Sequence, residues 1–350
     1  MRTDLPIADV KALLLARCET LVRELCPDGA RAGLYWMARN PARDDRRAGS
    51  FWVIVKGGSA GVWRDEATGD HGDVLKLIAY VHGSSLGEAI RWAKGWLGLA
   101  AMEPGALEKA RTAAVERDRQ RDRAERLAAE DKARKAFGWW LHAERRIAGT
   151  PVEAYLAARG IELSKLARAP GAIRYLPRAE HRASGTSWPA MIAAMTNEHG
   201  SVVAVHRTFL ERDGSGKAPV TPQKMIWPSF RGCSIRLSRG VNDCSVEEAS
   251  RQGLAETLIL CEGIEDGLSL ALAMPEARVW AAATLGNLGE IVLPVCAQEV
   301  IVAADNDWGK PQAERMLSRG IEALARQGRP VRVARSTVGK DFNDALRGAA

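Results

Sequence analysis

Two short apolar runs, each ending at acidic residues, constrain the fold of this chain more than any other feature. Residues 257–261 are followed by Glu262, and residues 300–304 are followed by Asp305 and Asp307. Continuous apolar runs of this length are typical of strands that are buried on both faces of a parallel sheet. In open α/β sheets, ligands bind beyond the carboxyl ends of the strands. The pattern therefore predicts an α/β domain with three carboxylates gathered at one edge of its sheet.

The spacing of these acids suits a divalent cation. Asp305 and Asp307 are two residues apart, so in extended backbone their side chains point the same way. Two hard oxygen ligands on one side can hold Mg²⁺, and Glu262 would lie at the end of a neighbouring strand. An Asp-x-Asp pair alone also fits a turn that caps a helix. Its combination with a Glu-Gly strand end favours the metal site.

With these residues, the segment 257–344 resembles the Toprim domain, the catalytic fold of bacterial-type DNA primases and of type IA and type II topoisomerases. In that family a first strand ends in Glu-Gly, as at Glu262, and a later strand ends in Asp-x-Asp, as at Asp305 and Asp307. Bacterial primases also carry an acid four residues after the glutamate, which Asp266 matches. The resemblance implies Mg²⁺ or Mn²⁺ as the cofactor and the first three acids as its ligands and catalytic residues.

Two later motifs extend the resemblance to primases. The loop 284–287 is similar to a Gly-containing loop that follows the second strand of the family. Residues 340–343 are similar to a Lys-Asp-Pro-Asp-like motif, with Asp341 at the first acidic position and Asn343 at the second. Asp266 and Asp341 are therefore expected to be secondary acids. The whole chain most resembles the Toprim primase-like proteins of phages, plasmids and integrated elements.

Residues 1–102 resemble the zinc-ribbon domain that opens bacterial primases. That domain holds zinc with a Cys-x-x-His and a Cys-x-x-Cys pair. Here Gly29 stands where the histidine of the first pair would be, three residues after Cys26, and residues 63–66 replace the second pair. A structural zinc site needs about four nitrogen or sulfur ligands, so we expect no zinc. Instead, an aromatic core of Phe51, Trp52 and Trp63 is predicted. The expected elements are a helix at 1–25, strands at 50–55 and 61–63, and helices at 74–81 and 85–97.

Residues 103–136 are expected to form a charged helical linker. Between 108 and 135 there are ten Lys or Arg, seven Asp or Glu, and no Gly or Pro. A helix of this composition is solvated and carries salt bridges along its faces. Binding of nucleic acid is the less favoured use of this segment, because its charges nearly cancel.

Residues 137–253 are expected to form a basic middle subdomain, with a helix at 152–159 and antiparallel strands at 188–195 and 201–210. Residues 201–240 hold seven Lys or Arg and two Asp or Glu, whereas residues 254–350, the predicted Toprim domain, hold ten and thirteen. The middle part is similar to the basic subdomain that precedes Toprim in primases. The phosphate-binding candidates are Arg207, Lys217, Lys224 and, in the Toprim segment, Lys310, although each could instead be an exposed turn residue.

The sequence thus predicts an α/β protein, α+β overall, that acts as a primase-like nucleotidyl transferase. The expected partners are a single-stranded DNA template and ribonucleoside triphosphates. No ATPase motif is visible, so any helicase would be a separate chain. No signal peptide or membrane-spanning run is visible, and the six scattered cysteines suit reduced cytoplasmic thiols. Two alternatives stay open: a Toprim nuclease or topoisomerase-like enzyme that cleaves DNA strands, and a non-catalytic DNA-binding accessory of a mobile element.

Overall fold

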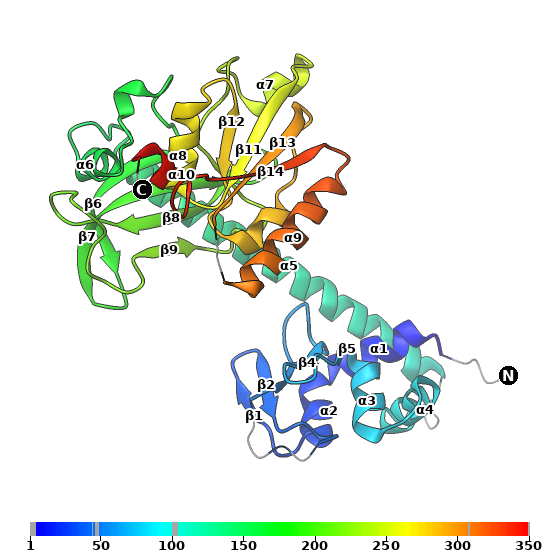
Figure 1. The fold of residues 1–350 in the computed structure, drawn as a ribbon. Coiled ribbons are helices and arrows are strands. Elements are labelled where there is room, and N and C mark those ends of the chain that lie inside the picture. The colour runs from blue at the N-terminus through cyan, green and yellow to red at the C-terminus, as the bar shows by residue number, and fades with distance from the viewer. Residues whose placement is uncertain (1–4, 44, 46–48, 100–103, 307–308, 349–350) are drawn as a thin grey trace. The chain divides into compact units, whose positions relative to one another are not determined.

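The computed structural model describes residues 5–43, 45, 49–99, 104–306 and 309–348. The chain divides into two compact units, Met1–Ala128 and Ala129–Ala350 (Figure 1). Helix α5 (Pro104–His142) contains the boundary between them, and it covers residues 104–136 of the charged segment in which a helix was predicted. In the described part of the chain, no helix is long and apolar enough to span a membrane.

The first unit is built on an antiparallel meander of five short strands, covered by helices. The predicted hairpin is confirmed, because β3 pairs with β4 and Val53 is opposite Trp63. Both predicted later helices are also present, and Ser85 caps the second through its side chain. The elements are α1 (Ile7–Ala16), α2 (Cys18–Leu25), β1 (Ala30–Ala32), β2 (Tyr35–Ala38), β3 (Phe51–Ile54), β4 (Trp63–Asp65), β5 (His71–Gly72), α3 (Val74–His82) and α4 (Leu86–Trp96).

Two details of this unit differ from the sequence-based expectation. The single helix expected before residue 26 is broken at Arg17, whose φ of −120° is not helical, and both halves bury apolar residues in one core. Trp52 does not join the aromatic core, because β3 alternates and Trp52 points to the opposite face from Phe51. Tyr80 of α3 takes its place, with its ring centroid 4.6 Å from that of Trp63.

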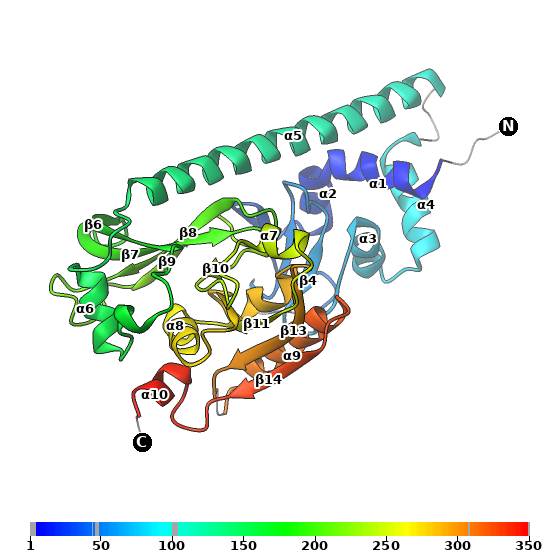
Figure 2. The ribbon, with the colours of Figure 1, turned by 90° about the horizontal axis from the view of Figure 1, so that it is seen from above.

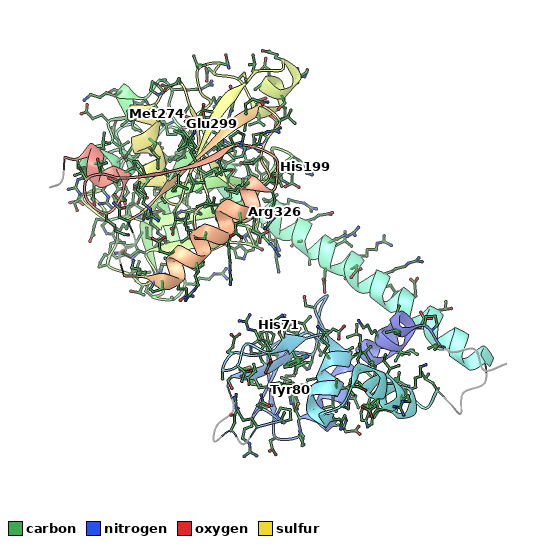
Figure 3. All side chains as sticks on the ribbon, turned by 45° about the vertical axis from the view of Figure 1, so that its right-hand side comes forward. His71, Tyr80, His199, Met274, Glu299 and Arg326 are labelled. Carbon is green, nitrogen blue, oxygen red and sulfur yellow. The ribbon has the colours of Figure 1, made fainter. Side chains whose placement is uncertain are left out.

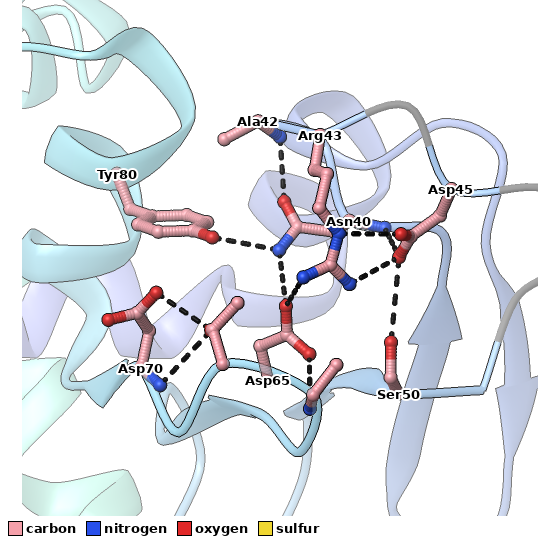
Figure 4. A network of polar contacts seen from close by, with 10 residues as sticks. Asn40, Ala42, Arg43, Asp45, Ser50, Asp65, Asp70 and Tyr80 are labelled. Atoms are coloured by element: carbon pink, nitrogen blue, oxygen red, sulfur yellow. Dashed lines mark hydrogen bonds and ion pairs between the residues drawn. The ribbon is translucent and has the colours of Figure 1, made fainter.

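A polar network in the first unit joins the loop after β2 to the end of β4 (Figure 4). Asp65 has no solvent exposure. Its Oδ2 accepts a hydrogen bond of 2.6 Å from the Asn40 amide and lies 3.2 Å from the Arg43 guanidinium. Tyr80 Oη lies 2.8 Å from the same amide nitrogen. His71, labelled with Tyr80 in Figure 3, is exposed on β5 and takes no part in the network.

The second unit combines two sheets. An antiparallel sheet of order β6-β7-β8-β9 contains both predicted middle strands, and a second sheet has the order β10-β12-β11-β13-β14. The elements of the first part are α6 (Pro151–Ala158), β6 (Ile173–His181), β7 (Thr186–Thr196), β8 (Val202–Phe209), β9 (Lys224–Trp227) and β10 (Ile235–Arg236). Those that follow are α7 (Val246–Arg251), β11 (Glu256–Cys261), α8 (Ile264–Ala273), β12 (Arg278–Ala281), β13 (Ala297–Ala304), α9 (Pro311–Ala325), β14 (Val331–Arg335) and α10 (Phe342–Leu346).

The second sheet is mixed, as four parallel strands are extended by β10, which pairs antiparallel with β12. Both of its faces are buried, which explains the continuous apolar runs. Leu260 and Val302 face a core that includes Leu317 of α9, whereas Ile259 and Cys261 face a core shared with α8 and the antiparallel sheet. Helix α10 packs beside α8 (Figure 2).

Candidate active site

The carboxyl ends of β11 and β13 bring two of the predicted acids to one edge of the mixed sheet. Cys261 is opposite Ala303, so Glu262 and Asp305 leave adjacent strands at nearly the same level. Both acids line one hollow, which Thr284 and Glu314 also line. Burial raises the pKa of the Cys261 thiol, and the nearby negative charges of Glu262 and Asp305 raise it further. Asp307, the third predicted ligand, lies outside the described residues.

Asp266 approaches the same edge from the first turn of α8. It is buried, and its Oδ1 accepts a hydrogen bond of 3.1 Å from the Asn343 backbone N–H. Burial, followed by the negative charges of Asp341 and Asp305, raises the pKa of Asp266 to about 7. Burial is the largest cause of this raised pKa, and the two neighbouring carboxylates add to it.

The glycine of the Glu-Gly pair has a steric role at this edge. Gly263 has a φ of −91°, which any residue can adopt. A Cβ at this position would lie 2.6 Å from Oδ2 of Asp266, closer than carbon and oxygen can approach. A side chain at position 263 would therefore require the Asp266 carboxylate to move from the place it holds here.

The residues of the last motif cap and anchor α10. The Asp341 side chain accepts the Asp344 N–H at 2.9 Å and caps the helix, while its charge contributes to the raised pKa of Asp266. Asn343 is buried, and its amide donates to the Arg159 carbonyl at 2.8 Å and to Ser269 Oγ at 3.0 Å. An aspartate could not donate these bonds, so Asn343 has a structural reason to depart from the primase pattern.

Lys217 and Lys224 of the basic middle part converge on Glu265, an acid that the sequence reasoning missed. Glu265 follows Ile264 at the start of α8, and its carboxylate lies 3.3 Å from Lys224 Nζ and 3.7 Å from Lys217 Nζ. Tyr155 of α6 donates a hydrogen bond of 2.6 Å to the same carboxylate. The available signal was an acid inside a helix whose neighbouring residues are almost all apolar or small.

The electrostatics of this group confirm that its charges are coupled. Burial alone would raise the pKa of Glu265, but Lys224, the Tyr155 hydroxyl and Lys217 lower it to about 2. Burial and the nearby Lys224 charge lower the pKa of Lys217. His206 of β8 is buried beside them, and burial together with both lysines lowers its pKa to about 4, so it is neutral at pH 7.

The structure does not bring the other two phosphate-binding candidates into this group. Arg207 points to the opposite face of β8 from His206, and its guanidinium lies 5.3 Å from the centre of the Trp139 ring. Lys310 is exposed at the residue before α9. A role in phosphate binding for either residue stays a prediction.

The donors at the strand ends fit a hard cation in chemistry. All of them are carboxylate oxygens, which Mg²⁺ prefers. Lys340 brings one cation of the chain to this edge, with Nζ 3.6 Å from Asp305 Oδ2. Among the described residues, no group of three His, Cys, Asp or Glu side chains is placed to hold a metal ion. A complete site would therefore need the undescribed Asp307.

Comparisons with known proteins identify the second half of this unit. A family model described as a Toprim domain matches residues 257–350, and a model of a domain of unknown function, DUF7146, matches residues 130–237. The predicted Toprim domain is therefore confirmed, whereas the predicted boundaries at 102, 136 and 253 stay predictions. No curated protein matches the chain.

Three solved structures similar to this chain are distant from it in sequence. The Aquifex aeolicus primase, with its zinc-binding and RNA polymerase domains, is 17% identical over 97% of this chain and 82% of that one, with a TM-score of 0.40. A DNA primase domain from Pseudomonas aeruginosa is 15% identical over 64% of this chain and 73% of its own, with a TM-score of 0.38. The bacteriophage T7 primase fragment is 13% identical, covers 55% and 69%, and has a TM-score of 0.33.

Proposed function

We propose that this protein is a primase-like nucleotidyl transferase that joins ribonucleoside triphosphates on a single-stranded DNA template. One observation carries the proposal: the acidic sheet edge and the group of basic side chains around Glu265 meet at two adjacent residues of helix α8. Asp266 belongs to the first and Glu265, with its lysines, to the second. Transfer of a nucleotidyl group needs both polarities, one for the cation and one for the phosphates.

The roles divide as follows. Glu262, Asp305 and Asp307 would hold Mg²⁺ or Mn²⁺, which when bound neutralises charge on the reacting phosphate and favours ionisation of the attacking 3′-hydroxyl. Asp266 and Asp341 are secondary acids that set the negative field of the edge. Lys217 and Lys224 bind phosphate oxygens of the incoming nucleotide through their ammonium N–H groups. Most of the catalytic work of such a site is positioning and electrostatic stabilisation.

Several further parts of the proposal rest on the resemblance of the sequence to primases. The first unit would be a zinc-ribbon-like domain that needs no zinc, and the chain would serve replication of a mobile element. A replicative helicase would be a separate partner. Each of these parts is tested apart from the chemistry.

The decisive experiment is primer synthesis by the purified full chain. Protein, single-stranded DNA, labelled ribonucleotides and either Mg²⁺ or Mn²⁺ are incubated, and the products are separated on a denaturing gel. Labelled oligonucleotides that are absent with EDTA support the proposal. Cleaved template would show a Toprim nuclease or topoisomerase-like enzyme instead, and a gel shift with neither product would show a DNA-binding accessory.

A further inference from the structure

Glu265 is the centre of a buried cluster drawn from four segments of the second unit. Tyr155 comes from α6, Lys217 from the loop before β9, Lys224 from β9 itself, and Glu265 from α8. The Glu265 side chain is only 6% exposed, and each of the other three contacts its carboxylate. The cluster therefore fixes the two ammonium groups relative to the helix that also carries Asp266.

The cluster holds more positive than negative charge. Besides both lysines, Arg159 lies close enough that Tyr155, Glu265 and Asp341 together raise its pKa despite its partial burial. Both lysines contact the same acid, Glu265, in the described part of the chain. Three cations and the two carboxylates of Glu265 and Asp341 leave a net positive charge that attracts a further anion.

The lysines also keep donors for a ligand. An ammonium group has three N–H donors, and their side chains stay 22% and 38% exposed. The pair Glu256–Arg278, at the other end of β11, is different. Its side chains are 2% and 3% exposed, and Arg278 also donates to the Cys244 carbonyl. The Glu256–Arg278 pair is therefore out of reach of a ligand, whereas the lysines of the Glu265 cluster stay partly exposed to solvent.

We infer that Glu265 is a positioning residue for a nucleoside triphosphate. Its carboxylate holds the ammonium groups of Lys217 and Lys224 beside the acidic edge, so that their remaining N–H groups meet the phosphates. Tyr155 positions the carboxylate in turn. This inference rests on the proposed function and deepens it, because it assigns the orientation of the phosphate-binding lysines to an acid that touches no substrate itself.

The inference has a pH dependence that a purely structural acid would lack. The groups facing the lysines are Tyr155 and Arg159 at the end of α6, His206 of β8, Glu265 and Asp266 of α8, and Asp341 before α10. Glu265 is the acid that contacts both ammonium groups. Burial and Lys224 lower the pKa of Lys217, and the Glu265 charge opposes them. Without that charge Lys217 loses its proton at lower pH, so triphosphate affinity should fall sooner as the pH rises.

The test compares Glu265→Gln with Glu256→Gln, a matched loss of a buried carboxylate from the same strand–helix unit. Binding of ATP and of inorganic tripolyphosphate is measured by calorimetry from pH 6 to 9, together with KM, kcat and thermal stability. We expect Glu265→Gln to weaken binding and raise KM about tenfold or more at pH 7, as for loss of a charge-assisted contact, with a larger effect at pH 9. Glu256→Gln should lower stability and leave KM unchanged.

A second variant, Tyr155→Phe, keeps every charge and removes one hydrogen bond to Glu265. We expect a smaller rise in KM in the same direction, which decides the matter if Glu265→Gln does not fold. Equal affinities for wild type and both variants at every pH would overturn the inference while leaving the proposed function intact. A wild-type protein that binds no triphosphate would overturn the proposed function itself.

Discussion

Two buried aspartates, one in each unit, have pKa values that are shifted in opposite directions. Asp65 of the first unit is fully buried, yet its pKa lies below the usual range. Burial alone would raise it, but the Ala67 N–H, the Asn40 amide and the Arg43 guanidinium outweigh burial. Asp266 of the second unit is 8% exposed, and its pKa rises to about 7, because burial and then the negative charges of Asp341 and Asp305 all raise it.

The difference teaches how to tell a structural acid from one that belongs to a site. The hydrogen-bond donors and the cation around Asp65 all belong to the chain, so its carboxylate is satisfied without a ligand (Figure 4). Asp266 is buried among other acids, an arrangement that destabilises the fold unless a cation from outside joins it. Glu265 stands between the two cases, because its cations belong to the chain but keep donors for a ligand.

The largest effect expected from this comparison is on catalysis. Asp305→Asn should reduce primer synthesis by on the order of 100-fold or more, as for other losses of transition-state electrostatic stabilisation, and should leave the fold intact. The exposed acid Glu290, which pairs with Arg231 at 2.8 Å, supplies the control Glu290→Gln. Near wild-type rates in Asp305→Asn would end the assignment of this edge as the cation site.

The next largest effect is on the stability of the first unit. Asp65→Asn removes the charge of a fully buried acceptor that receives hydrogen bonds from Asn40 and the Ala67 N–H. We expect a loss of about 2–3 kcal/mol in the free energy of unfolding. Hydrogen exchange followed by mass spectrometry locates the loss, which should be confined to peptides of residues 5–99. Unchanged protection there would mean that the network is not a stabilising device.

A smaller effect should appear in the pH dependence of stability, with opposite windows for the two aspartates. Asp266 keeps its proton in the folded protein up to about pH 7, whereas an unfolded aspartate loses it near 3.9. Stability should therefore fall as the pH rises from about 4 to 7, and Asp266→Asn should flatten that fall. The lowered pKa of Asp65 makes its contribution disappear only as the pH falls below about 4. Urea unfolding in EDTA across this range, with each single variant, measures both windows.

The smallest expected effect is that of removing metal ions from the first unit, where we expect no change in stability. If the first unit is held by its aromatic core and the Asp65 network, EDTA should not change its melting temperature. Elemental analysis of the purified chain should find no stoichiometric zinc. One zinc per chain, lost together with folding on chelation, would show that the cysteines or histidines of residues 5–99 form a site, and the Asp65 network would not then be the reason this unit folds.

The acidic edge could be predicted because its signal lies in residues that are close together in the chain. Apolar runs with a strand period end at Glu262 and Asp305, and neighbouring parallel strands then have to bring the two acids together. The helices expected at 85–97 and 152–159 are likewise present, and the side chains of Ser85 and Thr150 cap them through backbone N–H groups two or three positions away. What could be predicted was therefore whatever depends on neighbours in the chain.

The features that were missed depend on distant partners. The partners of Glu265 are Lys224, 41 residues earlier, and Tyr155, 110 residues earlier. The outward turn of Trp52 follows from which face of β3 the helices cover, and the break at Arg17 follows from the core that both helices share. No local pattern encodes such contacts, since tertiary packing overrides propensity when the two disagree.

The edge strand β10 bears on which part of the chain can be separated from the rest. The Toprim model begins at residue 257, but the mixed sheet borrows Ile235 and Arg236 from the preceding segment, and its core is shared with the antiparallel sheet. A gene fragment cut at 257 would encode a sheet with the outer edge of β12 open to self-association. A fragment that keeps this edge covered would have to begin before β10, so the Toprim domain depends structurally on the segment that precedes it.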